Sequence, residues 1–225
     1  MPGTDRPFGL LGSRRRGSVR FVVVSPRRTQ EERSAENRTR LLDATVECLI
    51  ERGYAGTTTS AVQERAGVSR GALMHHYSSK AELMVAAVRH LARQRGENLR
   101  RQASQLTEDQ DRVSQAIDLL WDTFTGPLFT ATLELWSAAR TDAELWPAVY
   151  DWERSLRQDL SAVMEELFGA DAASRPAFAE AVEMTLQFMR GAALTSILRT
   201  DRSRQRQAIE RWKDVFSMLM TDQVG

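Results

Sequence analysis

The sequence predicts an all-α protein with a small N-terminal head and a larger helical body. Along most of the chain, apolar residues recur at steps of three and four, the spacing that places them on one face of a helix. Glycine and proline end these stretches, most clearly at Gly53, Gly67, Gly126-Pro127 and Gly169. A length of 225 residues is sufficient for both parts.

The composition is that of an ordinary soluble protein, with 42% hydrophobic and 27% charged residues. No apolar run is long enough to span a membrane. The single cysteine, Cys48, excludes an intrachain disulfide and suits a reducing cytosol, so we expect a cytoplasmic protein. Cys48 lies beside an apolar stripe, where packing is its expected role.

Residues 1–33 are expected to form a disordered basic extension, because glycine, proline, serine and arginine dominate them. Residues 1–30 carry seven arginines and one aspartate, a net charge of +6. Phe21–Val24 is too short for the core of a signal peptide. The extension could be a solvated tail, an over-extended start, or a source of non-specific attraction for phosphate.

The first helix is expected from Ser34 or Glu36 to Arg52, where Gly53 closes it and Tyr54 packs across the head. Its apolar stripe consists of Leu41, Leu42, Thr45, Val46, Leu49 and Ile50.

Two shorter helices follow between Thr57 and Lys80. Thr58, Thr59 or Ser60 can cap the first of them, and Gly67 suits the left-handed position that ends it. After a buried Val68, Ser69 can cap the second helix, Arg70–Tyr77. Two short helices joined by a tight turn that contains glycine are typical of a helix-turn-helix, whose second helix enters the major groove of DNA.

The residues at the start of the second helix suit this role. Small residues allow a helix to approach base edges, Arg70 can reach guanine or phosphate, and the Ala72 methyl matches a thymine methyl. At the start of the next helix, free N–H groups and the Lys80 amine can face anions together. The predicted DNA contacts are Thr58, Thr59, Ser69, Arg70, Gly71, Ala72, His75, His76, Tyr77 and Lys80.

The two adjacent histidines are not expected to hold a metal ion. Neighbouring residues on a helix point about 100° apart, and one cysteine and His90 are the remaining candidates for a zinc site. We expect neither a metal nor a cofactor, and at least one of His75 and His76 should face phosphate.

Residues 36–85 resemble the tetracycline-repressor (TetR) family of bacterial regulators. The resemblance is carried by Arg40–Ala44, Glu51–Tyr54, Thr57–Thr59, Ala66–Leu73 and His75–Leu83. It implies a homodimer of all-helical subunits, each with an N-terminal DNA-binding head and a C-terminal domain that binds a small inducer. The sequence departs from the family at Met74, where an aromatic residue is usual and a tyrosine hydroxyl contacts phosphate.

The charge distribution agrees with specific rather than broad DNA attraction. Residues 31–80 have no net charge and residues 81–225 have a net charge of −5. A neutral head must therefore bind DNA through a few placed cations.

The helix expected at 80–105 begins with apolar residues that close the head and continues as a charged connecting rod. Movement of its far end would rotate the head. We expect a DNA-binding domain at 34–80, completed by the start of this helix. A ligand-binding and dimerisation domain should occupy 81–225.

Further helices are expected at 111–125, 127–140, from a capping box at Thr141–Glu144 to Phe168, at 176–199 and at 203–220. The helix at 176–199 is apolar on two faces. One holds Phe178, Val182, Thr185, Met189 and Ala193, and the other holds Met184, Phe188, Gly191 and Leu198. With the last helix it should form a four-helix bundle across a twofold axis. The predicted dimer contacts are Phe178, Val182, Met189, Trp212 and Phe216.

Aromatic residues and methionines are concentrated in the segments before this helix, and such side chains either fill a core or line an adaptable apolar pocket. The predicted pocket consists of Trp121, Phe124, Leu133, Trp136, Leu156 and Phe188, with Glu134, Gln187 or Arg140 as polar anchors. We expect an apolar or aromatic ligand.

The expected function is a homodimeric repressor that a small apolar or aromatic inducer releases from a palindromic DNA operator. The alternative is a helix-turn-helix regulator without such a ligand, controlled by a protein partner or acting as an activator. An enzyme is not expected, because there is no nucleophile elbow, phosphate loop or metal-ligand cluster, and all three histidines lie between residues 75 and 90.

Overall fold

The computed structural model describes residues 29–107, 112–198 and 202–221. All regular elements in these ranges are helices, which confirms the predicted all-α class. They are α1 (Gln30–Gly56), α2 (Thr59–Ala66), α3 (Arg70–His76), α4 (Lys80–Ala103), α5 (Arg112–Phe124), α6 (Pro127–Ala139), α7 (Leu145–Phe168), α8 (Ala170–Ala173), α9 (Phe178–Ser196) and α10 (Arg202–Thr221). In these same ranges, no helix is long and apolar enough to cross a membrane.

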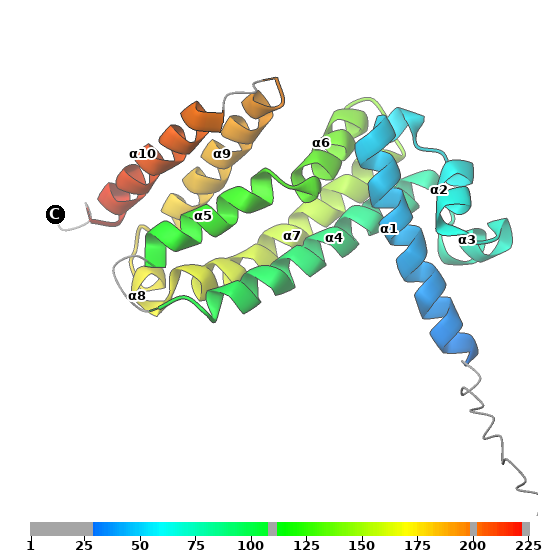
Figure 1. The fold of residues 1–225 in the computed structure, drawn as a ribbon, viewed down its shortest axis with the longest axis horizontal. Coiled ribbons are helices and arrows are strands. Elements are labelled where there is room, and N and C mark those ends of the chain that lie inside the picture. Colours follow the sequence, from blue (N-terminus) through cyan, green and yellow to red (C-terminus); the bar gives the residue numbers. More distant parts are fainter. Residues whose placement is uncertain (1–28, 108–111, 199–201, 222–225) are drawn as a thin grey trace, which may run out of the picture.

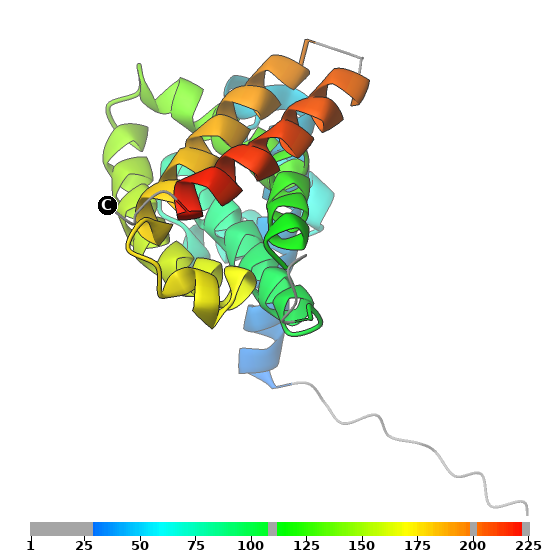
Figure 2. The same cartoon turned by 90° about the vertical axis from the view of Figure 1, so that its left-hand side faces the viewer.

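The helices form an elongated molecule with the helix-turn-helix at one end (Figure 1). Helices α1, α2 and α3 make up the head, and α4 and α7 run side by side from the head into the body. Helices α9 and α10 pack against each other as an antiparallel pair on the side of the body away from the head, and Figure 2 shows this pair facing the viewer.

Helix α1 begins earlier than the sequence suggested. Thr29 and Glu32 form a capping box, in which the Thr29 hydroxyl accepts from the Glu32 amide at 3.1 Å and the Glu32 carboxylate accepts from the Thr29 amide at 2.8 Å. The predicted disordered extension at 1–33 was therefore wrong for residues 30–33, which are helical, while residues 1–28 lie outside the described ranges. The predicted break at Gly53 is confirmed by its φ of 66°.

The predicted caps of the two short helices are confirmed. The Thr58 hydroxyl accepts from the Ala61 amide at 3.1 Å, and the Ser69 hydroxyl accepts from the Ala72 amide at 3.3 Å. Gly67 adopts the left-handed conformation, with φ 62° and ψ 37°. These local interactions set the sharp turn between α2 and α3.

One hydrophobic core joins the head to part of the body. Buried residues of the head pack in the same cluster as Ala131 and Leu135 of α6 and Leu145 and Trp152 of α7. Burial of a leucine side chain contributes about 1.5–3 kcal/mol to folding, so this shared core fixes the head against α6 and α7. The predicted connecting helix α4 is therefore supported by this shared core in joining the head to the body.

The start of α7 differs from the prediction of a capping box at Thr141–Glu144. Instead, the Asp142 carboxylate accepts from the Glu144 amide at 3.0 Å and from the Leu145 amide at 2.9 Å. The predicted arrangement was wrong because the turn places Asp142, rather than Thr141, beside the free amides. Gly169, with φ 88°, ends α7 as predicted, and the short helix α8 follows it.

Candidate DNA-binding surface and ligand cavity

The N-terminal part of α3 is exposed and carries small residues beside one cation. Ser69, Arg70 and Gly71 are exposed, and a Cβ atom built on Gly71 would meet nothing within 4 Å. The Arg70 guanidinium has no partner among the described residues. Thr58 and His75 are exposed near this surface, whereas Thr59, Ala72 and His76 are half-buried. The arrangement offers a slim helix end with one free guanidinium, which suits insertion into a major groove.

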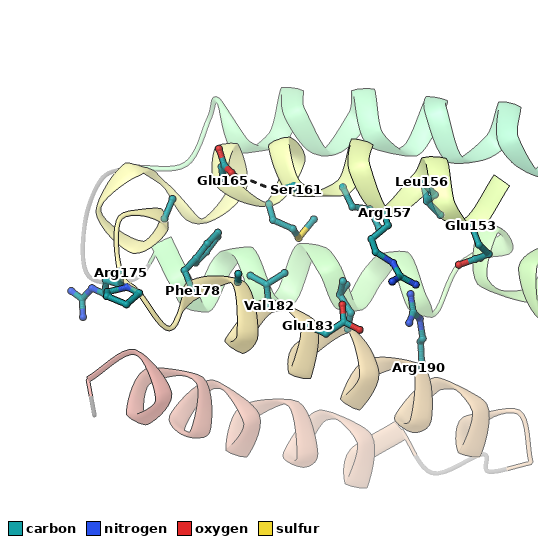
Figure 3. Close-up of a pocket in the computed structure, with 16 residues that line it drawn as sticks. Glu153, Leu156, Arg157, Ser161, Glu165, Arg175, Phe178, Val182, Glu183 and Arg190 are labelled. Carbon is teal, nitrogen blue, oxygen red and sulfur yellow. Dashed lines mark hydrogen bonds between the residues drawn. The ribbon is translucent and has the colours of Figure 1, made fainter. Parts of the chain in front are cut away.

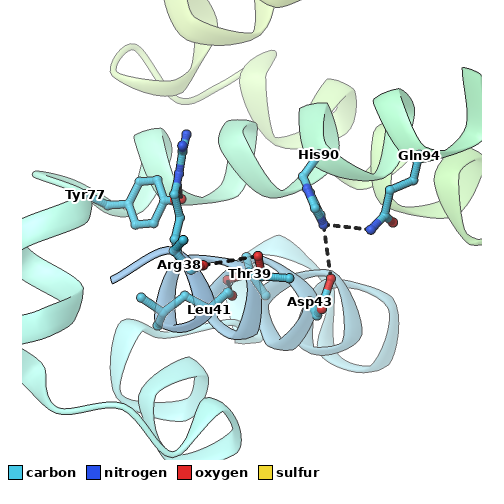
Figure 4. A network of polar contacts seen from close by, with 9 residues as sticks. Arg38, Thr39, Leu41, Asp43, Tyr77, His90 and Gln94 are labelled. Carbon is cyan, nitrogen blue, oxygen red and sulfur yellow. Dashed lines mark hydrogen bonds and ion pairs between the residues drawn. The ribbon is translucent and has the colours of Figure 1, made fainter. Parts of the chain in front are cut away.

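Tyr77 was predicted to contact DNA, and the structure corrects this assignment. The side chain is 4% exposed and belongs to the head core, and its hydroxyl accepts from Arg38 Nε at 3.4 Å. Figure 4 shows Arg38 of α1 beside Tyr77, which follows α3, and shows His90 on α4. His90 Nε2 lies 3.3 Å from Asp43 Oδ1 and 2.9 Å from Gln94 Nε2, so α4 is also fixed to α1.

Lys80 was also predicted to bind phosphate, and in this structure its ammonium group contacts Tyr54. Lys80 Nζ donates to the Tyr54 carbonyl at 2.7 Å and lies 4.2 Å from the centre of the Tyr54 ring. Burial is the cause of its lowered pKa. The start of α4 is not open to anions either, because the Glu82 carboxylate accepts from both the amide and the hydroxyl of Ser78, at 2.7 Å each. These hydrogen bonds lower the pKa of Glu82 and keep a negative charge there.

Tyr54 links the head to the body instead of packing across the head. Its amide donates to Glu134 Oε2 of α6 at 3.0 Å, and its hydroxyl donates to Asp142 Oδ2 at 3.0 Å. Burial and the Asp142 carboxylate raise the pKa of Tyr54 to about 12. Gly53 admits this contact, because a Cβ atom there would lie 2.7 Å from Glu134 Oε2 and because its φ is positive. We name the set Gly53, Tyr54, Lys80, Glu134 and Asp142 the junction.

An apolar cavity of about 100 Å³ lies in the body between α4, α5, α6, α7 and α9. Phe124, Trp136 and Leu156 of the predicted pocket line it. Its polar lining includes Arg95, Glu153 and Arg190; Trp136 Nε1 donates to Glu153 Oε1 at 2.8 Å, and the Arg190 guanidinium lies 5.5 Å from the centre of the Trp136 ring. A groove of about 340 Å³ between α7 and α9 adjoins the cavity (Figure 3).

The other predicted pocket residues lie elsewhere. Trp121 faces a separate surface groove, and Phe188 stacks on Trp212 with ring centres 4.4 Å apart. Leu133 lines neither the apolar cavity nor the groove beside it. The predicted polar anchors were wrong too: Glu134 belongs to the junction, Gln187 is exposed and hydrogen-bonded to Glu183, and Arg140 is exposed outside both cavities.

The predicted dimer contacts lie mainly on the inner face of α9 and α10. Met189 and Phe216 are fully buried, and Phe178 and Val182 are each 8% exposed, in the core of the same chain. Trp212 is half-buried and donates from Nε1 to the Thr185 hydroxyl at 3.0 Å. These four side chains therefore pack within the subunit and do not form its outer apolar face. The exposed large apolar residues of this helix pair are Met184, Leu194, Val215 and Met218. Ile197 and Leu198, directly after the end of α9, are exposed as well.

Residues 41–87 match the sequence pattern of the bacterial regulatory proteins of the TetR family. The chain is also 31% identical over 185 residues to the helix-turn-helix transcriptional regulator CymR of Pseudomonas putida, covering 80% of this chain and 90% of CymR. The chain belongs to the TetR family.

Solved structures agree with this TetR family fold at lower sequence identity. A protein from Pseudomonas aeruginosa PAO1 superposes with a TM-score of 0.64 at 21% identity, over 87% of this chain and 94% of that protein. FadR from Bacillus subtilis, solved in complex with stearoyl-CoA, superposes with a TM-score of 0.58 at 16% identity, over 81% and 97% of the two chains. The protein is thus a TetR family transcriptional regulator with a helix-turn-helix DNA-binding head.

The roles of several residues of this TetR family protein were not predicted from the sequence. Arg95 lies in the part of α4 that was predicted to be a charged connecting rod, yet it donates to the Thr123 hydroxyl at 2.9 Å and lines the cavity. Arg190 is the one basic residue in the helix Phe178–Ser196, and this isolation was a usable signal. The Tyr54–Glu134 contact joins residues 80 positions apart and had no local signal.

Proposed function

We propose that the protein is a cytoplasmic, homodimeric transcriptional repressor that a small molecule releases from a palindromic operator, and that it has no catalytic activity. In this proposal Ser69, Arg70, Gly71 and Ala72 enter the major groove, with contacts from Thr58, Thr59, His75 and His76 around them. This set keeps all the predicted DNA contacts except Tyr77 and Lys80, whose side chains have structural partners.

The dimer is proposed to form through the exposed face of α9 and α10. Met184, Gly191 and Leu194 recur along one side of α9, and Gly191 leaves room for close approach because a Cβ atom there would meet nothing within 4 Å. Val215 and Met218 extend the apolar surface onto α10. A self-complementary face of this kind suits a twofold axis, which would place two α3 helices on one operator.

The observation that carries the ligand-responsive part of the proposal is the position of α6. This helix presents Glu134 to the head through Tyr54, and it presents Thr132 and Trp136 to the apolar cavity. A ligand that enlarges the cavity would move α6 and thereby shift the head. A coupling of about 1–3 kcal/mol is typical of such linkage and would weaken DNA binding substantially. FadR supports the proposal as a protein of the same fold solved with a ligand.

Filling the cavity is expected to abolish the ligand response while leaving DNA binding in place. Gly96 lines the cavity on α4, and a Cβ atom there would have its nearest neighbour, Arg100 Nη1, at 4.0 Å. Gly96→Leu should therefore place a side chain in the ligand's space. The measurement is operator affinity by fluorescence anisotropy, with and without a compound that releases the wild-type protein.

Gly96→Ala is the matched control, because both substitutions remove a helical glycine and only leucine fills the cavity. Each should raise the free energy of unfolding by about 0.5–1 kcal/mol. The alanine variant should still release DNA at ligand concentrations within about twofold of wild type. A leucine variant that still responded normally would place the ligand site elsewhere.

A further inference from the structure

Two arginines converge where the apolar cavity meets the groove between α7 and α9. The two spaces share the lining residues Glu153, Leu156, Leu160, Met164, Leu186 and Arg190, so one molecule can extend from one into the other. Figure 3 shows the side chains of Arg157, from α7, and Arg190, from α9, pointing toward each other at this boundary. Like charges that face each other repel, and an anion between them favours both charged forms.

The carboxylates that line the groove are hydrogen-bonded to neutral donors and are not paired with these two arginines. Within the described ranges, neither Arg157 nor Arg190 has an ion pair with an acidic side chain, although three glutamates line the groove. Glu153 accepts from Trp136 Nε1 at 2.8 Å, Glu183 accepts from Gln187 Nε2 at 2.8 Å, and Glu165 accepts from the Ser161 hydroxyl at 3.5 Å.

The third arginine of the groove behaves differently. Arg175 donates to Asp171 Oδ2 at 3.1 Å and to the Met220 carbonyl at 3.2 Å, which is the usual state of a surface arginine. Arg190 instead lies over the Trp136 ring. Such stacking orients a guanidinium while leaving its N–H donors available, and the planar fork of these donors matches a carboxylate.

We propose that the ligand of this protein is an amphipathic carboxylic acid. Its carboxylate binds between Arg157 and Arg190, and its apolar part extends past Leu156 and Leu160 into the cavity beside Trp136. In other proteins, an apolar cavity of about 150 Å³ is large enough to hold a benzene molecule. A cavity of about 100 Å³ therefore takes a short alkyl end as it stands, and a larger apolar group would widen it. This inference rests on the proposed ligand response and specifies its chemistry.

The test compares three eight-carbon compounds that differ only in their head group: octanoate, 1-octanol and octylamine. Binding to the full-length protein is measured by isothermal titration calorimetry at neutral pH, without DNA. Octanoate is expected to bind about tenfold or more tightly than octanol, because charge-assisted hydrogen bonds are about twice as strong as neutral ones. Octylamine should bind more weakly than octanol.

Variants that remove one arginine charge test whether Arg157 and Arg190 cause the preference for octanoate. Arg190→Gln should weaken octanoate binding to the level of octanol and leave octanol within about twofold, and Arg157→Gln should have a smaller effect because Arg157 is more exposed. Arg154→Gln is the control: it removes the same charge from an exposed position of α7 outside both cavities and should change neither affinity.

Equal affinity for octanoate and octanol would overturn the inference, as would tighter binding of octylamine, absence of binding by all three compounds, or equal losses for octanoate and octanol in Arg190→Gln. Operator release is measured separately. If octanol and octanoate released DNA equally well, the proposed function would stand and the carboxylate site would fail. If octanoate bound selectively but left operator affinity unchanged, the carboxylate site would stand and the proposed ligand response would fail.

Discussion

Replacing Arg70 with alanine is expected to lower the affinity of the dimer for its operator by about thirtyfold or more. A well-placed arginine contact to a base contributes about 1–3 kcal/mol, and a symmetric dimer loses one contact in each half-site. Folding should be unaffected, because Arg70 is exposed and has no partner in the part of the chain that the structure describes. Fluorescence anisotropy with labelled operator, at one fixed salt concentration, measures the change.

Arg154→Ala serves as the control for this loss of charge, since Arg154 is exposed on α7 in the body. It should change operator affinity by less than about twofold. If Arg70→Ala bound the operator as tightly as wild type, the assignment of α3 as the recognition helix would be wrong.

The double substitution of Met184 and Leu194 by glutamate is expected to convert the proposed dimer into a monomer. Each substitution occurs twice across a twofold interface, so four unpaired carboxylates would lose their hydration on association. The dissociation constant of the dimer should rise by about a thousandfold or more, since each buried unpaired charge costs several kcal/mol. Sedimentation equilibrium over a range of protein concentrations gives this constant directly.

Tyr150→Glu is the matched control, because Tyr150 is a large exposed side chain on α7 that lies outside the α9–α10 face. The control should remain dimeric. Circular dichroism should show native helix content in both variants, since Met184 and Leu194 are 42% and 51% exposed and contribute little to the core of the subunit. Dimerisation of the double variant with unchanged affinity would exclude this face as the interface.

The sequence was sufficient where structure depends on neighbours along the chain. The Ser69 cap and the left-handed Gly67 follow from residues within a few positions and were predicted correctly, and Thr58 is one of the three caps that were considered for α2. The start of α1 was predicted four residues too late. The signal was again local, because the Thr29–Glu32 capping box was overlooked within a basic segment.

The sequence was insufficient where distant residues decide the role of a side chain. Lys80 was interpreted as a phosphate ligand because its partner, the Tyr54 carbonyl, is 26 positions away. Tyr77 was misassigned for a similar reason, since its burial depends on packing with other helices of the head.

The error in the dimer contacts has a different origin. Helical periodicity correctly identified two apolar faces on α9, one with Val182 and Met189 and the other with Met184 and Gly191. Periodicity contains no information on which face packs inside the subunit. Because α5 and α10 pack against the first face, the second is exposed and takes its place in the proposed dimer.

The most direct test of the account is to sequence the native genomic DNA fragments that the purified wild-type protein retains, in parallel with those retained by Arg70→Ala. The account predicts a palindromic site in the wild-type fragments, with half-sites about one DNA turn or a multiple apart, and loss of that site in the variant. Retention of no common sequence, or of one asymmetric site in both samples, would contradict the central claim that paired α3 helices read an operator.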